Sequence, residues 1–243
     1  MGAVPGGRVL TSGATLGPSG PAPPPFDVDA FRPLGRTLVR RRHAHPAVVL
    51  GSSQREELVD RAKAQALGLE VVRRRSGGGA VLVQPGDPVW FDVWVPRGDP
   101  LFDDDVVAAA GWVGRWWSTA LAACGARPTV VHDGPSTANE WSATVCFAGL
   151  GPGEVTASGR KVVGVAQWRG REGSLFHTAA HRVWDPVALT DLLHLPDEAR
   201  RRAGSDLAQA GLGLEDLLGS GLDALGAALS SLLPGTGWDH LTD

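Results

Sequence analysis

Three consecutive glycines between two short apolar runs constrain the fold more than any other feature of this sequence. Gly77-Gly78-Gly79 stand between an apolar run at 69–73 and a second run at 80–83. Glycines weaken neighbouring strands, so a triplet is expected where the backbone must take unusual angles or allow a close approach. The segment is not a P-loop, because no Gly-Lys-Ser/Thr follows, and it is not a dinucleotide-binding turn, because no helix is expected after the glycines.

Apolar runs bounded by Gly, Pro and Asp predict one domain that mixes strands with helices. Strands are expected over residues 47–51, 69–73, 80–83, 89–95, 128–132, 154–157 and 162–168. Helices are expected over 55–67, 103–124 and parts of 184–233. His177 and His181 are expected to share one helix face, and Arg40-Arg41-Arg42 to lie in a solvated strand or loop. The fold class predicted is α+β, with a mixed β-sheet packed by helices in one domain.

Composition sets the boundaries of this domain and excludes several classes of protein. Residues 1–25 are rich in Pro and Gly and predict a disordered tail, which leaves 26–243 as the folded domain. A net charge of −3 argues against a broad basic surface for nucleic acid. No apolar run is long enough to span a membrane, and two cysteines cannot form a disulfide framework. We therefore expect a cytoplasmic protein.

A second segment, after a predicted turn at Ser158-Gly159, carries the features of an anion-binding site. Lys161 is one of only two lysines among the 23 basic residues, and it heads an apolar strand. An ammonium group in such a place needs an anionic partner. Gly164 in the strand interior indicates a ligand close to the backbone. Arg73 and Arg74, before the glycines, add paired donors for carboxylate or phosphate oxygens.

Together the two segments resemble the lipoate–protein ligase A family, within the biotin/lipoate ligase catalytic group. The pattern Arg-Arg-x-Ser-Gly-Gly-Gly-Ala-Val falls on Arg73, Arg74 and residues 76–81. The pattern Gly-x-Lys-(apolar)-x-Gly-x-Ala-Gln falls on Gly159, Lys161, Val162, Gly164, Ala166 and Gln167. This resemblance covers roughly residues 40–185 and implies a biotin/lipoate-ligase-like catalytic domain.

The resemblance implies an enzyme that attaches an acyl group to a lysine of a lipoyl-carrier domain. The expected reaction is that of an ATP-dependent ligase, which joins lipoate or octanoate to AMP with ATP and Mg²⁺. The acceptors implied are the E2 subunit of 2-oxoacid dehydrogenases and the glycine-cleavage H protein. Lys161 would bridge the acyl carbonyl and the α-phosphate, and no protein-bound metal is expected. The substrate- and nucleotide-binding residues implied are Arg73, Arg74, Ser76, Gly77, Gly78, Gly79, Ala80, Gln54, Gly164, Gln167 and His177.

Two alternatives stay open at the level of the sequence. Cys146 occupies a place similar to that of the acyl-accepting cysteine in octanoyl- or lipoyl-transferases of the family, which need no ATP. A non-catalytic acyl-binding paralogue is the other, because Val83, Gln84 and Asp87 replace residues that the family often carries after the glycines. The ligase is preferred because an arginine-flanked glycine loop suits phosphate better than an octanoyl carrier requires. Cys124, near a predicted helix end, is expected only to pack.

Overall fold

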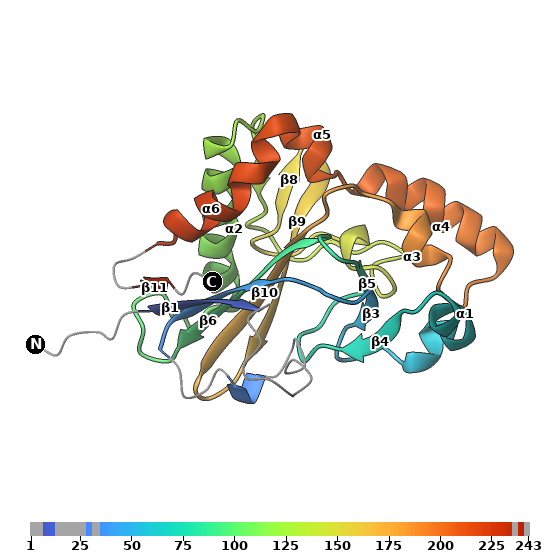
Figure 1. Cartoon of the computed structure of the whole chain (residues 1–243), viewed down its shortest axis with the longest axis horizontal. Helices are drawn as coiled ribbons and strands as arrows, with labels where there is room; N and C mark the ends of the chain where they lie inside the picture. Colours follow the sequence, from blue (N-terminus) through green and yellow to red (C-terminus); the bar gives the residue numbers. More distant parts are fainter. Residues whose placement is uncertain (1–6, 13–27, 31–34, 235–237, 241–243) are drawn as a thin grey trace, which may run out of the picture.

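The computed structural model describes residues 7–12, 28–30, 35–234 and 238–240, and two sheets form its centre (Figure 1). The eight-stranded sheet of this described part has the order β11-β1-β2-β6-β10-β9-β8-β7. Its strands are β1 (Gly7–Ser12), β2 (Thr37–Arg41), β6 (Val89–Pro96), β7 (Val130–Val131), β8 (Val155–Ala157), β9 (Arg160–Arg169), β10 (Gly173–Ala180) and β11 (Trp238–His240). The pairs β1–β2 and β1–β11 are parallel, and the other pairs of this sheet are antiparallel.

The second sheet is small and has the order β4-β3-β5. It consists of β3 (Ala47–Leu50), β4 (Glu70–Arg73) and β5 (Val81–Val83). Side chains of β3 and β5 pack on Trp90 and Ala179 of the large sheet. The glycine triplet lies between β4 and β5, so it sits where the small sheet approaches the large one.

Helices cover the outer faces of the two sheets. Helices α2 (Val106–Ala123), α5 (Leu214–Leu218) and α6 (Leu222–Ser231) pack on the large sheet, whereas α1 (Arg61–Ala66), α3 (Pro186–Thr190) and α4 (Asp197–Ala210) pack on the small one. Figure 1 shows the first group at the upper left and the second group at the right. Short 3₁₀ turns are η1 (Val28–Ala30), η2 (Glu56–Leu58), η3 (Cys146–Ala148) and η4 (Gly219–Gly221).

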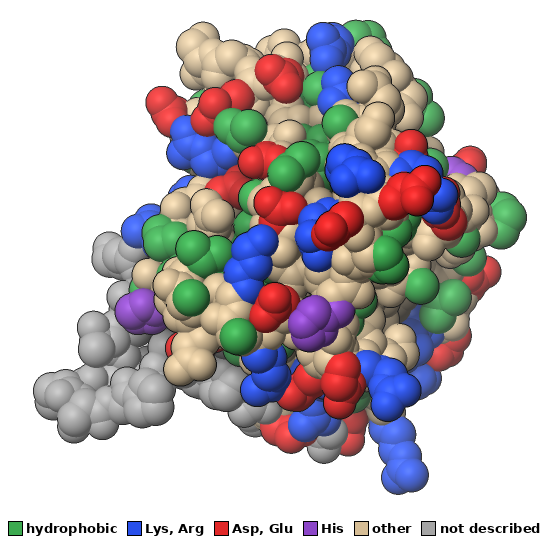
Figure 2. Space-filling view, turned by 90° about the vertical axis from the view of Figure 1, so that its right-hand side faces the viewer, with side chains coloured by type: hydrophobic (Ala, Val, Ile, Leu, Met, Phe, Trp, Pro, Cys, Tyr) green, Lys and Arg blue, Asp and Glu red, His purple; other side chains and the backbone are tan. Residues whose placement is uncertain are grey.

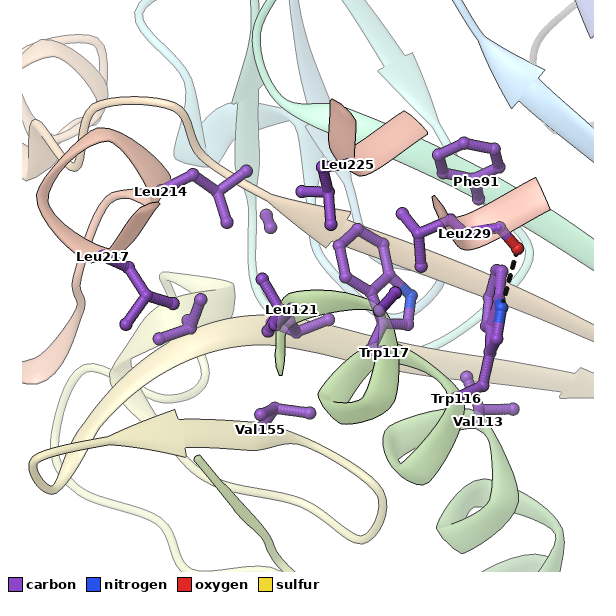
Figure 3. Close-up of a cluster of buried hydrophobic side chains, with 14 of the residues drawn as sticks. Phe91, Val113, Trp116, Trp117, Leu121, Val155, Leu214, Leu217, Leu225 and Leu229 are labelled. Atoms are coloured by element: carbon purple, nitrogen blue, oxygen red, sulfur yellow. Dashed lines mark hydrogen bonds between the residues drawn. The ribbon is translucent and has the colours of Figure 1, made fainter. Parts of the chain in front are cut away.

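The largest hydrophobic core lies between the large sheet and α2 (Figure 3). Asp105 caps α2 by accepting hydrogen bonds from the backbone N–H groups of Val107 and Ala108. Trp117 is fully buried, and Trp116 donates from Nε1 to the carbonyl oxygen of Leu229 at 2.8 Å. Both tryptophans therefore pack in the core, and α6 is fixed to α2 by a buried hydrogen bond.

The fold class predicted from the sequence is confirmed, and three local predictions need correction. Residues 7–12 of the predicted tail form β1, because the edge of β2 offers backbone hydrogen bonds that need no side-chain period; the other residues of 1–25 lie outside the described part. The helix predicted over 55–67 divides into η2 and α1, because Val59 forms a β-bridge with Leu193. His177 lies in strand β10 and His181 follows it, so neither is helical.

The surface agrees with the near-neutral charge. Figure 2 shows acidic and basic side chains interspersed on the face that carries α1 and α4. Among the described residues, no helix is long and apolar enough to cross a membrane.

Candidate active site

A small cavity lies between the two sheets, and its first wall is the inner face of the large sheet. Strand register aligns two rows of residues across β6, β10 and β9, which are Trp90–Ala179–Gly164 and Asp92–His177–Ala166. Glycine and alanine at these positions leave space above β9 and β10. The cavity measures about 10 Å³, which is close to the volume that one water molecule needs. Its lining residues are Arg74, Val81, Trp90, Cys146, Phe147, Gly164, Ala166, His177 and Ala179.

A β-bulge brings Lys161 to this cavity. Thr156 of β8 pairs with Lys161, but the next residue, Val155, pairs with Val163, so Val162 is one extra residue in β9. Side chains alternate along a strand, and without the bulge Lys161 would project from the opposite face to Gly164. A methyl group at Gly164 would instead lie 3.5 Å from Lys161 Cε. The bulge therefore aims the lysine at the cavity wall.

The ammonium group of Lys161 is buried and already has three partners. It forms an ion pair with Glu154 Oε2 at 2.7 Å and donates to the carbonyl oxygens of Cys146 at 2.8 Å and Gly149 at 3.1 Å. It also lies 5.1 Å from the ring centre of Phe147. An ammonium has three N–H donors, so these acceptors use all of them. The anionic partner that the sequence required is thus an acid of the chain itself.

Cys146 lies in the second wall, opposite the large sheet, and the glycine triplet packs directly against it. Cys146 donates its backbone N–H to Ala80 O at 3.1 Å. A methyl group at Gly79 would lie 2.4 Å from the carbonyl carbon of Val145, so only glycine fits there. Gly78 has a φ of +98°, and a methyl group on it would lie 2.9 Å from Arg74 Nη2 and 3.9 Å from Cys146 Sγ. The triplet therefore places a guanidinium and a thiol side by side.

The two arginines before the triplet bind the chain's own carbonyl groups. Arg74 is 2% exposed and donates to the carbonyl oxygens of Gly77 at 2.7 Å and Gly79 at 2.8 Å. Burial lowers the pKa of Arg74, while attraction to the Cys146 thiolate acts in the opposite direction; a guanidinium stays charged in either case. Arg73 donates to carbonyl oxygens of the 51–54 turn, including that of Gln54. Arg74 therefore lies within the site, whereas Arg73 is exposed and holds the 51–54 turn.

A buried charged cluster lies beside the cavity. Asp92 Oδ1 contacts His177 Nδ1 at 2.7 Å and accepts from Trp90 Nε1 at 2.8 Å, while Asp92 Oδ2 accepts from Arg41 Nε at 2.5 Å. Burial alone would raise the pKa of Asp92, but Arg41 and His177 more than offset it and lower the value to about 2. Arg41 is half-buried, with its side chain 9% exposed, because it reaches from β2 to the buried Asp92; Arg42 is exposed, as expected.

This pKa predicts how stability changes in acid. A folded-state pKa below the ordinary value means that ionised Asp92 stabilises the fold above about pH 4, and that this contribution is lost as the pH falls toward 2. We expect urea unfolding of the wild type and of Asp92→Asn to differ by on the order of 2 kcal/mol near pH 6. The difference should shrink toward pH 2.5. An equal difference at both pH values would contradict the assigned charge.

Most of the predicted site residues lie at the cavity, and two glutamines lie away from it. Arg74, Cys146, Gly164 and His177 line the cavity, with Lys161 against its wall, and Ala80 pairs with the Cys146 segment. Gln54 has a structural position instead. Its Oε1 accepts from the backbone N–H of Gly51, and its Nε2 donates to the carbonyl oxygens of Ala143 and Thr144, so it links two segments of the chain. Gln167 alternates with Ala166 along β9 and therefore faces the other side of the large sheet.

Two acids of the site were missed in the sequence. Glu154 begins the predicted strand 154–157, seven positions before the lysine for which an anionic partner is expected. Asp92 is a lone acid inside the alternating apolar run 89–95, and a carboxylate there signals a buried charged pair. The signal for both acids is the same, because a buried charged side chain needs a partner of opposite charge.

This chain is similar in sequence to curated proteins. Two curated relatives are octanoyltransferases LipM: one from Moorella thermoacetica, 29% identical over 74% of this chain and 66% of its own length, and one from Clostridioides difficile, 24% identical over 69% and 62%. The chain thus spans just under two thirds of the length of these relatives.

Solved structures share the fold. A bi-partite lipoate protein ligase from Thermoplasma acidophilum, studied with its E2 lipoyl domain, matches with a TM-score of 0.67 and 19% identity over 99% of this chain and 89% of that one. A lipoate-protein ligase A bound with ATP matches with a TM-score of 0.63 and 23% identity over 86% and 77%. The family model described as the lipoyl protein ligase A/B catalytic domain matches residues 32–224. The chain therefore belongs to the lipoyl protein ligase A/B catalytic domain family.

Proposed function

We propose that this protein is a cysteine-dependent protein acyltransferase that moves an octanoyl group onto a lysine of a lipoyl-carrier domain through a thioester on Cys146. The observation that carries the proposal is the position of Cys146, which lines the cavity with Arg74 beside its sulfur. A fixed cation beside the sulfur stabilises the negative charge of an attacking thiolate. The names of the two LipM relatives support the same chemistry.

The reaction divides into two acyl transfers. The Cys146 thiolate attacks the carbonyl carbon of an octanoyl thioester donor; the new C–S bond forms, the donor's C–S bond breaks, and the donor thiol leaves as a thiolate that takes up a proton. The neutral amine of the carrier lysine then attacks the acyl-Cys146. A C–N bond forms, the C–S bond breaks, the amine proton passes to solvent, and the thiolate is restored.

The cavity walls suit the acyl chain. Val81, Phe147, Ala166 and Ala179 offer apolar surface beside the thiol. An eight-carbon chain needs far more volume than the 10 Å³ present, so acyl loading must displace lining side chains. The acceptor we propose is the lipoyl domain of an E2 subunit, such as the one studied with the Thermoplasma ligase, or the glycine-cleavage H protein.

A second candidate, the ATP-dependent ligase of lipoate or octanoate, rests on one separate observation. Ser76 Oγ is buried and has no hydrogen-bond partner within the described ranges, and it precedes the exposed Gly77 and Gly78. A hydroxyl beside exposed glycine backbone can bind a phosphate group. Mg²⁺ would arrive on the nucleotide. The transferase is preferred because Arg73 and Arg74 donate to carbonyl groups of the chain and so lend less support to phosphate binding.

The choice of acyl donor tests the proposal. Purified protein is incubated with a lipoyl domain and either an octanoyl thioester of a phosphopantetheine carrier without ATP, or octanoate or lipoate with ATP and Mg²⁺. We expect the mass of the lipoyl domain to increase by one octanoyl group in the first mixture, at least about tenfold faster than in the second. Modification that requires ATP would establish the ligase instead, and modification in neither mixture would favour the acyl-binding paralogue.

A further inference from the structure

Glu154 is a buried acid that connects the Cys146 segment to strand β9. It is 4% exposed and precedes β8. Its Oε2 accepts from the backbone N–H of Gly151 at 2.7 Å and pairs with Lys161 Nζ at 2.7 Å, while its Oε1 accepts from the backbone N–H of Val165 at 3.1 Å. A carboxylate with this many donors is fixed in place.

Lys161 in turn holds the turn that carries the thiol. Its bonds to the carbonyl oxygens of Cys146 and Gly149 bracket η3, so the position of the thiol depends on that of the ammonium. Because all three donors are used, Lys161 acts on the cavity through its positive charge and not through a further hydrogen bond. That charge is offset by the carboxylate at 2.7 Å.

We propose that Glu154 is a positioning residue that holds Lys161 in place and offsets its charge, and thereby sets how readily Cys146 ionises. The proposal deepens the function proposed above and rests on it. The segments packed against η3 and the cavity carry these charged or titratable groups: Arg74 before the triplet, Glu154 before β8, Lys161 of β9, His177 of β10 paired with Asp92, and His181 after β10 paired with Asp87. With Lys161 offset by Glu154, Arg74 is left as the cation that favours the thiolate.

Replacing the Glu154 carboxylate with an uncharged amide tests this proposal most directly. In Glu154→Gln the charge of Lys161 is no longer offset, so the thiolate should form at lower pH. We expect the midpoint of the pH profile for iodoacetamide alkylation of Cys146, read by peptide mass spectrometry, to fall by about one unit. Cys124 in the same digest is the internal control, because it lies away from the cavity and should not shift. A folded variant, by near-ultraviolet circular dichroism, with the wild-type midpoint would overturn the proposal.

The amide group of Glu154→Gln would face the N–H donors of Gly151, Val165 or Lys161, so this variant can fail to fold. A second variant then tests the proposal. Glu154→Asp keeps the charge but is too short to reach Lys161 and Val165 together. We expect its alkylation midpoint to stay at the wild-type value, while the alkylation rate well above that midpoint changes, because the thiol has moved. A rate and midpoint both equal to the wild type would overturn the positioning role. Alkylation needs no acyl donor, so this result is independent of whether acyl transfer itself is detected.

Discussion

Replacing Cys146 with serine is expected to abolish acyl transfer from a thioester donor, by a factor of at least about 10³ in kcat. Serine keeps the size of the side chain, but its hydroxyl is not ionised at neutral pH, and Arg74 then has no thiolate to stabilise. The measurement is the initial rate of octanoyl transfer to a lipoyl domain without ATP. Retention of more than about a tenth of the wild-type rate would show that the acyl group does not pass through this residue.

The chain offers a matched control in its other cysteine. Cys124 follows α2, packs against the large core, and burial raises the pKa of its thiol. Cys124→Ser removes one thiol, as the first variant does, but does not touch the cavity. We expect it to transfer octanoate at close to the wild-type rate, and equal losses in both variants would mean that the assay reports general thiol chemistry.

Replacing Lys161 with methionine is expected to lower both stability and activity. Methionine preserves the length of the side chain but leaves the Glu154 carboxylate buried without its partner. Breaking a buried pair in this way costs about 3–5 kcal/mol in the free energy of unfolding. The transfer rate should fall by ~10² or more, because η3 loses the contacts that hold Cys146. Urea unfolding and the transfer assay measure the two effects separately.

The double variant Glu154→Gln/Lys161→Met separates the effect on stability from the effect on acyl transfer. It removes both charges at once, so it should regain part of the lost stability while staying inactive. Activity restored along with stability would contradict a functional part for the lysine. Lys161→Arg should also be poor, because a planar guanidinium cannot place three donors on Glu154, Cys146 O and Gly149 O.

The parts of the fold that depend on local sequence could be predicted. The turn at Ser158-Gly159 was predicted correctly because glycine adopts a positive φ at low cost, and Gly159 has a φ of 76° after Ser158 at 51°. The helix predicted over 103–124 is α2, which spans only Val106–Ala123 because the three acids precede it and Asp105 is its N-cap. The glycine triplet was correctly identified as a place of close approach, although the partner that approaches is the segment around Val145.

The parts that depend on distant residues could not be predicted. Asp92 meets Arg41 across 51 positions and His177 across 85, and only the order of strands β2, β6 and β10 brings them together. The direction of the Lys161 side chain depends on a bulge that alternation of apolar residues does not reveal. Arg73 and Arg74 looked available for phosphate because a sequence does not show which carbonyl groups they bind.

The most direct test is the intact mass of the protein after brief exposure to an octanoyl thioester donor, with neither ATP nor lipoyl domain present. Acyl transfer through Cys146 predicts the addition of one octanoyl group, located at Cys146 by peptide mapping, released by hydroxylamine and discharged when lipoyl domain is added. An unmodified protein under these conditions that goes on to modify the lipoyl domain only when ATP and free acid are supplied would contradict it.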